Sequence, residues 1–413
     1  MLLRFKRLLQ RTPFYKWYLL LCKHYRFWVQ DKQYPRIYRR AAKKPVDQNK
    51  VLFLECSRKT LSNSFDVLYH TLERDYDFDL HCHFLLHTTA SRRTQRRICR
   101  AFMRDLATAK VLFLDEGTDI LSHVDLRPET QVVQLWHGCG AFKKFGRSVA
   151  EKAFGASADY MDTHPFHSHY TLVTVSSPDV MWAYEEAMEY PRETGVVQPT
   201  GVSRTDVFFD PAFLQQTGET LYHVVPQAKG KRVLLYAPTF RGEIMDAYAP
   251  DVLDFEALKS ALGDGWVLLC KHHPHVKHRP QIPQSCRDFA FDVTDSMTIE
   301  DLLCVADVCV SDYSSLVFEY ALFQKPMLFL AYDLDDYFDY RGFYYDYHDL
   351  APGPIVRDTA GVIDFVAHLD TRFDPARVQA FRRKFMASCD GHATQRILQR
   401  VFGEALDAHR KNA

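Results

Sequence analysis

The chain has 413 residues, of which 47% are apolar and 25% are charged, and this globular composition leaves room for two domains of ordinary size. No apolar run approaches the ~18 residues that a membrane-spanning helix needs, and the start of the chain lacks the apolar core and cleavage site of a signal peptide. The ten cysteines are scattered and form no Cys-x-x-Cys pair, which predicts reduced thiols in a cytoplasmic protein.

Charge is unevenly distributed along the chain, although the formal net charge is zero. Residues 1–44 carry 13 Lys or Arg and one acidic residue, Asp31, whereas the remaining 369 residues carry 39 basic and 51 acidic residues. Ten aromatic residues are interleaved with the basic ones in this first segment. We take residues 1–48 as a basic, aromatic and helical segment, a composition typical of helices that lie on an anionic membrane surface.

Two alternative roles remain open for this basic segment. It could bind nucleic acid through base stacking and phosphate contacts, or it could pack as a basic helix on the acidic remainder of the chain. No nucleic-acid-binding module follows it, so we expect no nucleic-acid partner.

From residue 50 onward, short buried strands alternate with helices, which predicts a parallel sheet covered on both faces. This pattern defines a first Rossmann-like domain at 49–215. Strands are expected at 50–56, 80–87, 109–115, 131–136 and 171–177, with helices at 62–74, 91–107 and 178–190.

A second series of strands and helices begins after the stretch 210–231, whose poor periodicity indicates a linker. It defines a second Rossmann-like domain at 216–375, and C-terminal helices follow at 376–413. In such open sheets ligands bind at the carboxyl ends of the strands, so we expect the two domains to face a ligand-binding cleft. Strands are expected at 232–238, 266–274, 307–312 and 326–331, with helices at 254–262, 298–306 and 314–323.

The most informative strand end carries His137, directly followed by Gly138. A His with a pKa near neutrality, free of crowding by its neighbour, suits a general base. Lys143 and other basic residues within 143–147 would make the same region positive. A structural His that is hydrogen-bonded at a strand end is the simpler alternative.

Three further strand ends carry basic groups. Arg204 and Asp206 follow the first sheet, where they either bind substrate or brace a turn as a pair. Thr239 and Arg241 follow the strand at 232–238, and a guanidinium group matches a phosphate well.

The third of these strand ends, "CKHHPHVKH" at 270–278, brings Lys271 and four histidines close together. Histidines are common zinc ligands, but no Cys or carboxylate lies nearby at the spacing of a zinc site. We therefore predict no metal here. We instead expect His273 to contact a phosphate or a hydroxyl group of a substrate.

The stretch "VCVSDYSSLVFEYALFQKPMLFL" from Val308 ends a buried strand with Asp312, Ser314 and Ser315, just where a helix begins. Ser and Asp are ordinary helix N-caps, but the free N–H groups of a first helical turn also favour an anion. Glu319, further along this helix, could accept bonds from ribose hydroxyl groups. The acidic and aromatic stretch 332–354, which contains Arg341, is long enough to be a lid or substrate loop.

Six motifs at predicted strand ends or loops follow one another in the chain: Trp136-His137-Gly138, Thr200-Gly201 with Arg204-Thr205-Asp206, Ala237-Pro238-Thr239-Phe240-Arg241, His273-Pro274, Ser311-Asp312-Tyr313-Ser314-Ser315 and Arg341-Gly342-Phe343-Tyr344. This series resembles the CDP-glycerol glycerophosphotransferase family of teichoic-acid and capsule synthesis. The resemblance covers about residues 130–355 and extends more weakly over the first sheet.

The resemblance implies a GT-B-like fold that binds CDP-glycerol or a related CDP-polyol, with the acceptor on the first domain and the nucleotide on the second. The implied reaction is transfer of glycerol phosphate to a hydroxyl of a lipid-linked glycerol-phosphate or glycan acceptor, with release of CMP, by a protein peripheral to the inner face of the cell membrane. His137 matches the base of the family. His273, Arg241 and the Ser314-Ser315 helix start match the groups that hold the pyrophosphate, and no metal or other cofactor is implied.

The sequence departs from the family pattern at three positions. Cys139 and Gly140 follow the Trp-His-Gly motif in place of Thr-Pro, Ser203 stands in place of a Pro, and Glu319 replaces an Asp. These changes leave open the acceptor and the choice between glycerol and ribitol. A glycosyltransferase that uses a CMP- or UDP-sugar and an inactive nucleotide-binding scaffold remain as alternatives.

Overall fold

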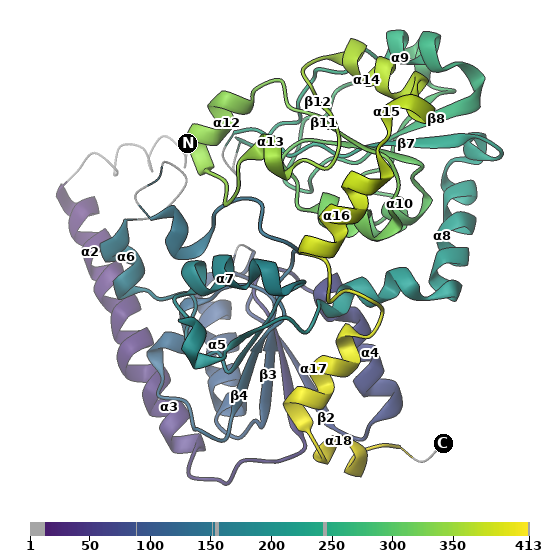
Figure 1. The fold of residues 1–413 in the computed structure, drawn as a ribbon. Coiled ribbons are helices and arrows are strands. Elements are labelled where there is room, and N and C mark those ends of the chain that lie inside the picture. The colour runs from purple at the N-terminus through teal and green to yellow at the C-terminus, as the bar shows by residue number, and fades with distance from the viewer. Residues whose placement is uncertain (1–12, 88, 151, 153–156, 243–245, 412–413) are drawn as a thin grey trace. The chain divides into compact units, whose positions relative to one another are not determined.

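The computed structural model describes residues 13–87, 89–150, 152, 157–242 and 246–411, which contain two six-stranded sheets (Figure 1). The first sheet has the strand order β2-β1-β3-β4-β5-β6, and its described registers are parallel. Its strands are β1 (Lys50–Glu55), β2 (Asp79–Phe84), β3 (Val111–Leu114), β4 (Gln131–Gln134), β5 (Leu172–Thr174) and β6 (Val197–Gln198). The helices between them are α4 (Asn63–Asp75), α5 (Arg92–Leu106), α6 (Ala158–Thr163) and α7 (Met181–Met188).

Helices α4 and α5 cover opposite faces of the first sheet. Phe53 of β1 contacts Phe65 of α4, with ring centroids 5.7 Å apart. Leu54, the next residue, points to the other face, which it shares with its register partner His83 of β2. The His83 ring lies 5.3 Å from the ring of Phe102 of α5, so this second face packs on α5. The apolar strand runs therefore have a core on each side, as the sequence predicts.

The second sheet has the order β12-β11-β10-β7-β8-β9 and is also parallel. Its strands are β7 (Arg232–Tyr236), β8 (Trp266–Cys270), β9 (Ala290–Asp292), β10 (Val308–Ser311), β11 (Met327–Leu330) and β12 (Ile355–Val356). The helices of this region include α8 (Pro211–Val224), α9 (Phe255–Leu262), α10 (Ile299–Val305), α11 (Leu316–Tyr320) and α14 (Thr359–Ala367). Two doubly wound parallel sheets are thus confirmed.

Two stretches differ from the expectation. The supposed linker 210–231 contains helix α8, because the Asp210 side chain accepts a hydrogen bond from Ala212 N at 2.9 Å and Pro211 suits a first helical turn. The lid-like stretch 332–354 contains α12 (Leu334–Arg341) and α13 (Tyr347–Leu350). The C-terminal part is helical, as expected, over α16 (Pro375–Phe385), α17 (Ala393–Phe402) and α18 (Ala405–Ala408), and α15 (Leu369–Arg372) precedes them.

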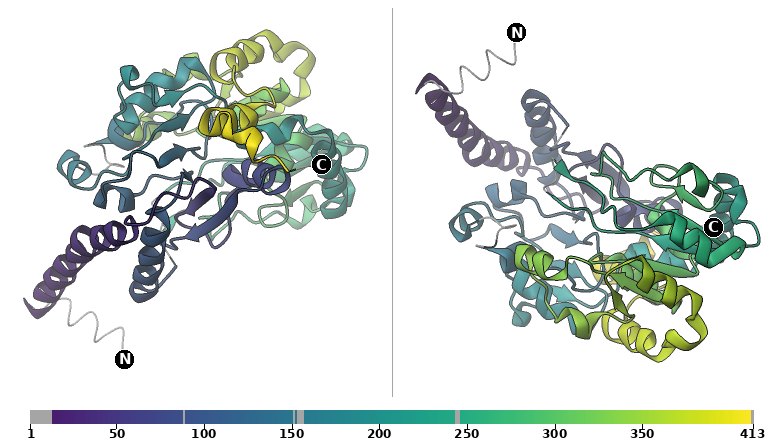
Figure 2. Two further views of the ribbon diagram at one scale, coloured as in Figure 1. Left: turned by 90° about the horizontal axis from the view of Figure 1, so that it is seen from below. Right: turned by 90° about the horizontal axis from the view of Figure 1, so that it is seen from above.

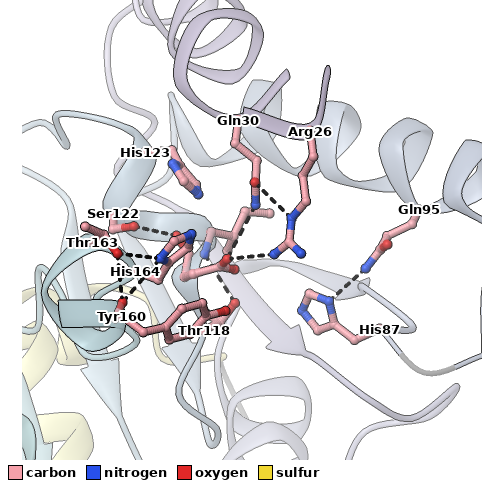
Figure 3. A network of polar contacts seen from close by, with 12 residues as sticks. Arg26, Gln30, His87, Gln95, Thr118, Ser122, His123, Tyr160, Thr163 and His164 are labelled. Atoms are coloured by element: carbon pink, nitrogen blue, oxygen red, sulfur yellow. Dashed lines mark hydrogen bonds and ion pairs between the residues drawn. The ribbon is translucent and has the colours of Figure 1, made fainter. Parts of the chain in front are cut away.

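The basic N-terminal segment is helical over α2 (Pro13–Trp28), a π-helical stretch (Val29–Gln33) and α3 (Tyr34–Ala41). In both views of Figure 2, α2 extends away from the strands of the first sheet. Its last turn and the π-helical stretch are anchored to the loop that carries Thr118 and Ser122 (Figure 3), where Arg26 Nη2 and Gln30 Nε2 lie 3.6 and 3.4 Å from Asp119 Oδ2.

The chain divides into two compact units, each described here by itself. The first unit comprises Met1–Gln134, Asp159–Leu172 and Glu404–Ala413, and the second comprises Leu135–Ala158 and Val173–Gly403. This division differs from the boundary expected near residue 215. It assigns the loop that carries His137 to the same unit as the second sheet.

The carboxyl ends of β1 and β3 carry two buried carboxylates, Glu55 and Asp115, which are 1% and 2% exposed. Ser62 Oγ donates to Asp115, and Glu55 Oε1 accepts from Ser57 N and Arg58 N at 3.1 Å each. Burial, together with the negative charge of Glu55 and Glu116, raises the pKa of Asp115 to about 7.

We expect Asp115→Asn to be more stable than the wild type at alkaline pH. A carboxyl whose pKa is raised by folding contributes stability that is complete below its unfolded pKa and lost as pH rises through its folded pKa. The wild type should therefore lose roughly 4 kcal/mol relative to the variant between about pH 4 and pH 8, at about 1.4 kcal/mol per pKa unit. Urea denaturation of both proteins across this range measures the difference. The same substitution at the exposed Asp125 is the control, and parallel curves for wild type and Asp115→Asn would contradict the prediction.

Candidate active site

Three neighbouring strands of the second sheet, β10, β7 and β8, direct the predicted site residues to one edge. Because the strands are parallel, the segments 312–315, 237–241 and 271–273 leave the sheet at the same end. The loop 135–146 and the turn at 203–206 belong to the same compact unit. The candidate site is described within this unit.

The His137 loop is fixed by packing and by hydrogen bonds. His137 is exposed, and its ring stacks on that of Trp136 with centroids 4.4 Å apart. The Tyr184 hydroxyl donates to Gly140 O at 3.0 Å, and Gly140 N donates to Ser176 Oγ at 2.9 Å. Gly140 has φ +64°, and a Cβ there would lie 2.4 Å from the Phe318 ring, so only glycine fits. The imidazole is thus held at the surface by a rigid loop.

Gly138 brings this loop to the start of α11. A Cβ on Gly138 would lie 3.5 Å from Ser315 Oγ, an ordinary van der Waals distance, so the loop passes beside that serine. Ser314 and Ser315 are half-buried, and Ser314 Oγ accepts a long hydrogen bond from Leu316 N at 3.5 Å. The Ser315 side chain makes no capping hydrogen bond to α11. Its hydroxyl group lies beside the His137 loop.

Arg204 joins the His137 loop to two buried helices. Its Nη1 donates to His137 O at 2.9 Å, and its Nη2 lies 2.6 Å from Glu319 Oε1 and 3.5 Å from Glu300 Oε1. The Cys139 thiol donates to the same Glu319 oxygen at 3.9 Å. This ion pair lies in the interior: the Arg204 and Glu319 side chains are only 12% and 3% exposed.

The pKa values of this cluster reflect burial and charge together. Burial raises the pKa of Glu319 to about 7, against the lowering effect of the Arg204 charge. Burial alone would lower the pKa of Arg204, but the carboxylates of Glu319 and Glu300 outweigh it and raise the value. Arg204 therefore stays charged. The raised pKa of Glu319 places the titration of its carboxyl group near neutral pH.

Arg241 forms a second buried hub at the edge of the sheet. Its Nε and Nη2 donate to the two Asp333 oxygens at 2.6 and 2.9 Å, and its Nη1 donates to Asp312 Oδ2 at 3.0 Å. Asp312 Oδ1 accepts from Thr239 N at 2.8 Å. The guanidinium also lies 5.2 Å from the Tyr313 ring centroid. Its hydrogen bonds are directed at protein groups, so Arg241 shapes the turn that leads from Asp312 to Ser314.

His273 and Lys271 leave β8 differently. His273 is exposed, its ring lies 4.9 Å from that of Phe240, and its Nδ1 accepts from His275 N at 3.2 Å. Lys271 Nζ donates to Thr294 O and Met297 O at 2.7 and 2.5 Å, and burial lowers its pKa. Lys271 braces a neighbouring loop, whereas His273 presents a ring at the surface.

Two more predicted residues concern the lid-like stretch: Lys143 contacts it, and Arg341 belongs to it. Lys143 forms an antiparallel bridge with Phe343, and its Nζ lies 5.4 Å from the ring centroid of Tyr337. Tyr337 in turn stacks on Tyr313 at 4.0 Å, which connects this stretch to the Arg241 hub. Arg341 ends α12, and its side chain lies outside the described residues.

Arg204 and Asp206 do not form the turn-bracing pair that their spacing allows. The Asp206 oxygens accept from Ala393 N and Thr394 N at 3.0 and 2.7 Å, at the first turn of α17. A carboxylate at this position stabilises the helix end through its N–H groups and dipole. Asp206 is thus engaged away from the Arg204 cluster.

The structure brings His137, Gly138, Arg204, Ser315 and Glu319 into one cluster and Thr239, Arg241 and Asp312 into the neighbouring one. Sequence reasoning missed Glu300 and Tyr184, and it placed Asp333 only within a loop. Glu300 lies beside a capping box at the start of α10, a local signal that explains its position by helix formation alone. The direct substrate contacts assigned to these residues stay predictions. Among the described residues, no group of three or more His, Cys, Asp or Glu is arranged to hold a metal ion.

We expect Glu319→Leu to destabilise the protein by about 3–5 kcal/mol, because it leaves the Arg204 charge buried with only the more distant Glu300. The double variant Arg204→Met/Glu319→Leu should recover much of this loss, since both charges are then removed together. Urea denaturation of the single and double variants gives the coupling.

Asp288→Leu serves as the matched control, because Asp288 pairs with Lys259 at 2.6 Å on the surface. Its free energy of unfolding should change far less. A Glu319→Leu variant no less stable than this control would show that the buried pair is not a structural constraint.

Comparisons with known proteins agree with the motifs. The family model for CDP-Glycerol:Poly(glycerophosphate) glycerophosphotransferase matches residues 36–403. The chain is 36% identical over 360 residues to the teichoic acid poly(ribitol-phosphate) polymerase of Bacillus spizizenii, covering 86% of this chain but only 56% of that protein. It is 34% identical over 371 residues to the teichoic acid ribitol-phosphate primase of the same organism, covering 86% and 90%.

The fold agrees as well. The solved structure of the wall teichoic acid polymerase TagF superposes with a TM-score of 0.75 at 20% identity, covering 95% of this chain and 98% of that one. This match confirms the GT-B-like fold expected from the sequence. Because the family model extends over nearly the whole chain, the protein belongs to the CDP-glycerol:poly(glycerophosphate) glycerophosphotransferase family.

Proposed function

We propose that this protein transfers a polyol phosphate from a CDP-polyol to a hydroxyl group of a lipid-linked acceptor and releases CMP. The observation that carries the proposal is the exposed His137 imidazole, held by a rigid loop against the start of α11. Family membership supports the reaction class. The chain spans little more than half of the poly(ribitol-phosphate) polymerase, so its acceptor and its product length are part of the proposal.

In the proposed reaction His137 acts as the general base. Its imidazole removes the proton of the acceptor hydroxyl as the oxygen attacks the phosphorus that carries the polyol. A P–O bond to the acceptor forms, the bond to the bridging pyrophosphate oxygen breaks, and CMP leaves with that oxygen. Arg204 supports this step indirectly, because its bond to His137 O fixes the loop while leaving the ring exposed.

Charge on the transferred phosphoryl group needs positioned donors. We assign this role to the ring of His273 and to the hydroxyl and N–H groups at Ser314 and Ser315. Because Arg241 is bound by Asp312 and Asp333, we assign to it the positioning of this serine turn rather than a direct phosphate contact.

The donor is either of two CDP-polyols. The family description names glycerol phosphate, whereas the two relatives described above are named for ribitol phosphate. CDP-ribitol and CDP-glycerol are therefore tested side by side.

We expect CMP release from one of these two donors only when a lipid-linked polyol-phosphate acceptor is present, and we expect it to persist in EDTA. His137→Ala should slow release by about 10²–10⁴-fold, the usual contribution of a general base. Chromatographic measurement of CMP gives the rate.

His223→Ala is the control, because His223 is an exposed histidine in the last turn of α8. Release of a nucleotide from UDP-sugars instead would favour the glycosyltransferase alternative. Tight CDP binding without turnover of any donor would favour the scaffold.

We further infer that the N-terminal helix brings the protein to an anionic membrane surface. Trp17, Leu20, Leu21, Tyr25 and Trp28 recur at helical spacing on one face of α2, and each is about half exposed or more, with Trp17 at 68%.

Positive charge lies along this apolar face. Arg96 of the arginine-rich helix α5 stacks 5.0 Å from the Tyr25 ring. An apolar stripe flanked by arginines suits the interface of an anionic bilayer. In the described part of the chain, no helix is both long enough and apolar enough to span a membrane.

We expect the triple variant Trp17→Ser/Leu20→Ser/Leu21→Ser to lose most of its binding to phosphatidylglycerol vesicles in a sedimentation assay. Binding by the wild type should weaken as salt rises, since part of the attraction is electrostatic. Leu214→Ser, an exposed leucine of α8, is the control. Equal sedimentation of the triple variant and the wild type would contradict the membrane role. Salt-dependent binding of RNA by the same helix would favour a nucleic-acid-binding role instead.

A further inference from the structure

A pocket of about 320 Å³ opens at the carboxyl ends of β11 and β12, on the side of the sheet away from β8. Ala331 and Leu334 line it from the segment after β11, and Ile355 lines it from β12. This volume lies at the lower end of the roughly 300–1,000 Å³ of small-molecule sites. The proposed reaction leaves this pocket unused.

Three basic side chains from separate elements converge on this pocket. They are His348 of α13, Arg357 just after β12 and Arg377 of α16. All three are exposed, so a ligand from solvent can reach them. Arg377 Nη2 donates to His348 O at 3.3 Å, which ties α16 to α13 at the mouth of the pocket.

The charge of the two arginines is not neutralised by protein groups. Within the described residues neither guanidinium lies within 4 Å of a carboxylate, in contrast to the ion-paired Arg204 and Arg241.

Three of the acidic residues close to these basic residues in sequence, Asp346, Asp358 and Asp374, are N-caps of helices. Asp358 Oδ1 accepts from Gly361 N at 2.9 Å, and Asp374 Oδ1 accepts from Ala376 N at 3.0 Å. Asp346, the N-cap of α13, accepts from His348 N at 2.8 Å through Oδ1, and Asp349 lies on α13 and is exposed. The pocket therefore combines the apolar side chains of Leu334 and Ile355 with two arginines that form no ion pair within the described residues.

Such a pocket suits a phosphate ester. Guanidinium groups bind phosphate oxygens through paired hydrogen bonds, and the apolar side chains can take the carbon atoms of the ester. A bare inorganic anion would leave those side chains unused. The segment 331–334 also connects this pocket to the active site, because it contains Asp333, the partner of Arg241.

We propose that the pocket lined by His348, Arg357 and Arg377 binds a phosphodiester of a polyol-phosphate chain, as a subsite for the acceptor or product polymer. The identity of the ligand rests on the proposed function, but the pocket itself does not. A subsite of this kind holds a growing chain after CMP has left, so that the next transfer begins from a bound acceptor.

The test measures binding rather than turnover. The full-length protein is titrated by calorimetry with a synthetic trimer of glycerol phosphate, with inorganic phosphate and with CDP. We expect Arg357→Ala/Arg377→Ala to weaken trimer binding by about 10–100-fold, the usual effect of losing hydrogen bonds to a charged group, and to leave CDP binding unchanged. Arg383→Ala, an exposed arginine on the same helix α16, should bind all three probes like the wild type.

Two outcomes would overturn the proposal: trimer binding unchanged in the double variant, and inorganic phosphate bound as tightly as the trimer, which would indicate a site for the free anion. A kinetic measurement separates this inference from the function. If the protein turns over a CDP-polyol, the double variant should raise KM for a polymeric acceptor without changing kcat. If no donor is turned over but the double variant still loses affinity for the trimer, the binding site in the pocket is supported and the proposed transferase activity is contradicted.

Discussion

The buried ion pair between Arg204 and Glu319 is the constraint on which the active site depends. A guanidinium removed from water must be paired, and here its partners come from three separate parts of the chain: the His137 carbonyl, Glu319 of α11 and Glu300 of α10. Moving Glu319 would leave the guanidinium with only the more distant Glu300, and moving the loop would break its bond to the His137 carbonyl. The loop that carries His137 is therefore fixed relative to the serine turn at 314–315.

Arg241 fixes the other side of that turn through buried ion pairs. It binds Asp312 at the end of β10 and Asp333 after β11, so two neighbouring strand ends are tied to one cation. Between these hubs lie Ser314 and Ser315, and the exposed rings of His137 and His273 lie in the same unit. Buried arginines thus fix the geometry, and exposed histidines and hydroxyls are left for substrate. This division of roles suits phosphoryl transfer, in which positioning and charge stabilisation provide most of the rate.

Much of this can be predicted from sequence because strands and strand ends are local signals. The apolar runs that form β7, β8 and β10, and the polar residues that follow them, are recognisable without the structure. What the sequence does not reveal is which polar groups pair, since Glu300 and Asp333 are distant in sequence from the arginines that they bind. Helix α8 escapes prediction for a different reason: its apolar periodicity is weak, and only Asp210 and Pro211 mark its start. The spacing of Asp206 from Arg204 suggests a shared role, whereas its carboxylate serves the end of α17.

The ion pairs show which of the basic residues keep a positive charge that is available to a ligand. The chain beyond residue 44 is acidic overall, and a negative surface would repel a polyanionic polymer unless positive charge were concentrated where that polymer binds. Arginines paired with carboxylates, such as Arg204 and Arg241, contribute structure but little attraction. Unpaired arginines are therefore the informative ones, and Arg357 and Arg377 line one pocket together with apolar side chains. Under the proposed function, a place that binds a phosphate chain would lie apart from the groups that break and form bonds.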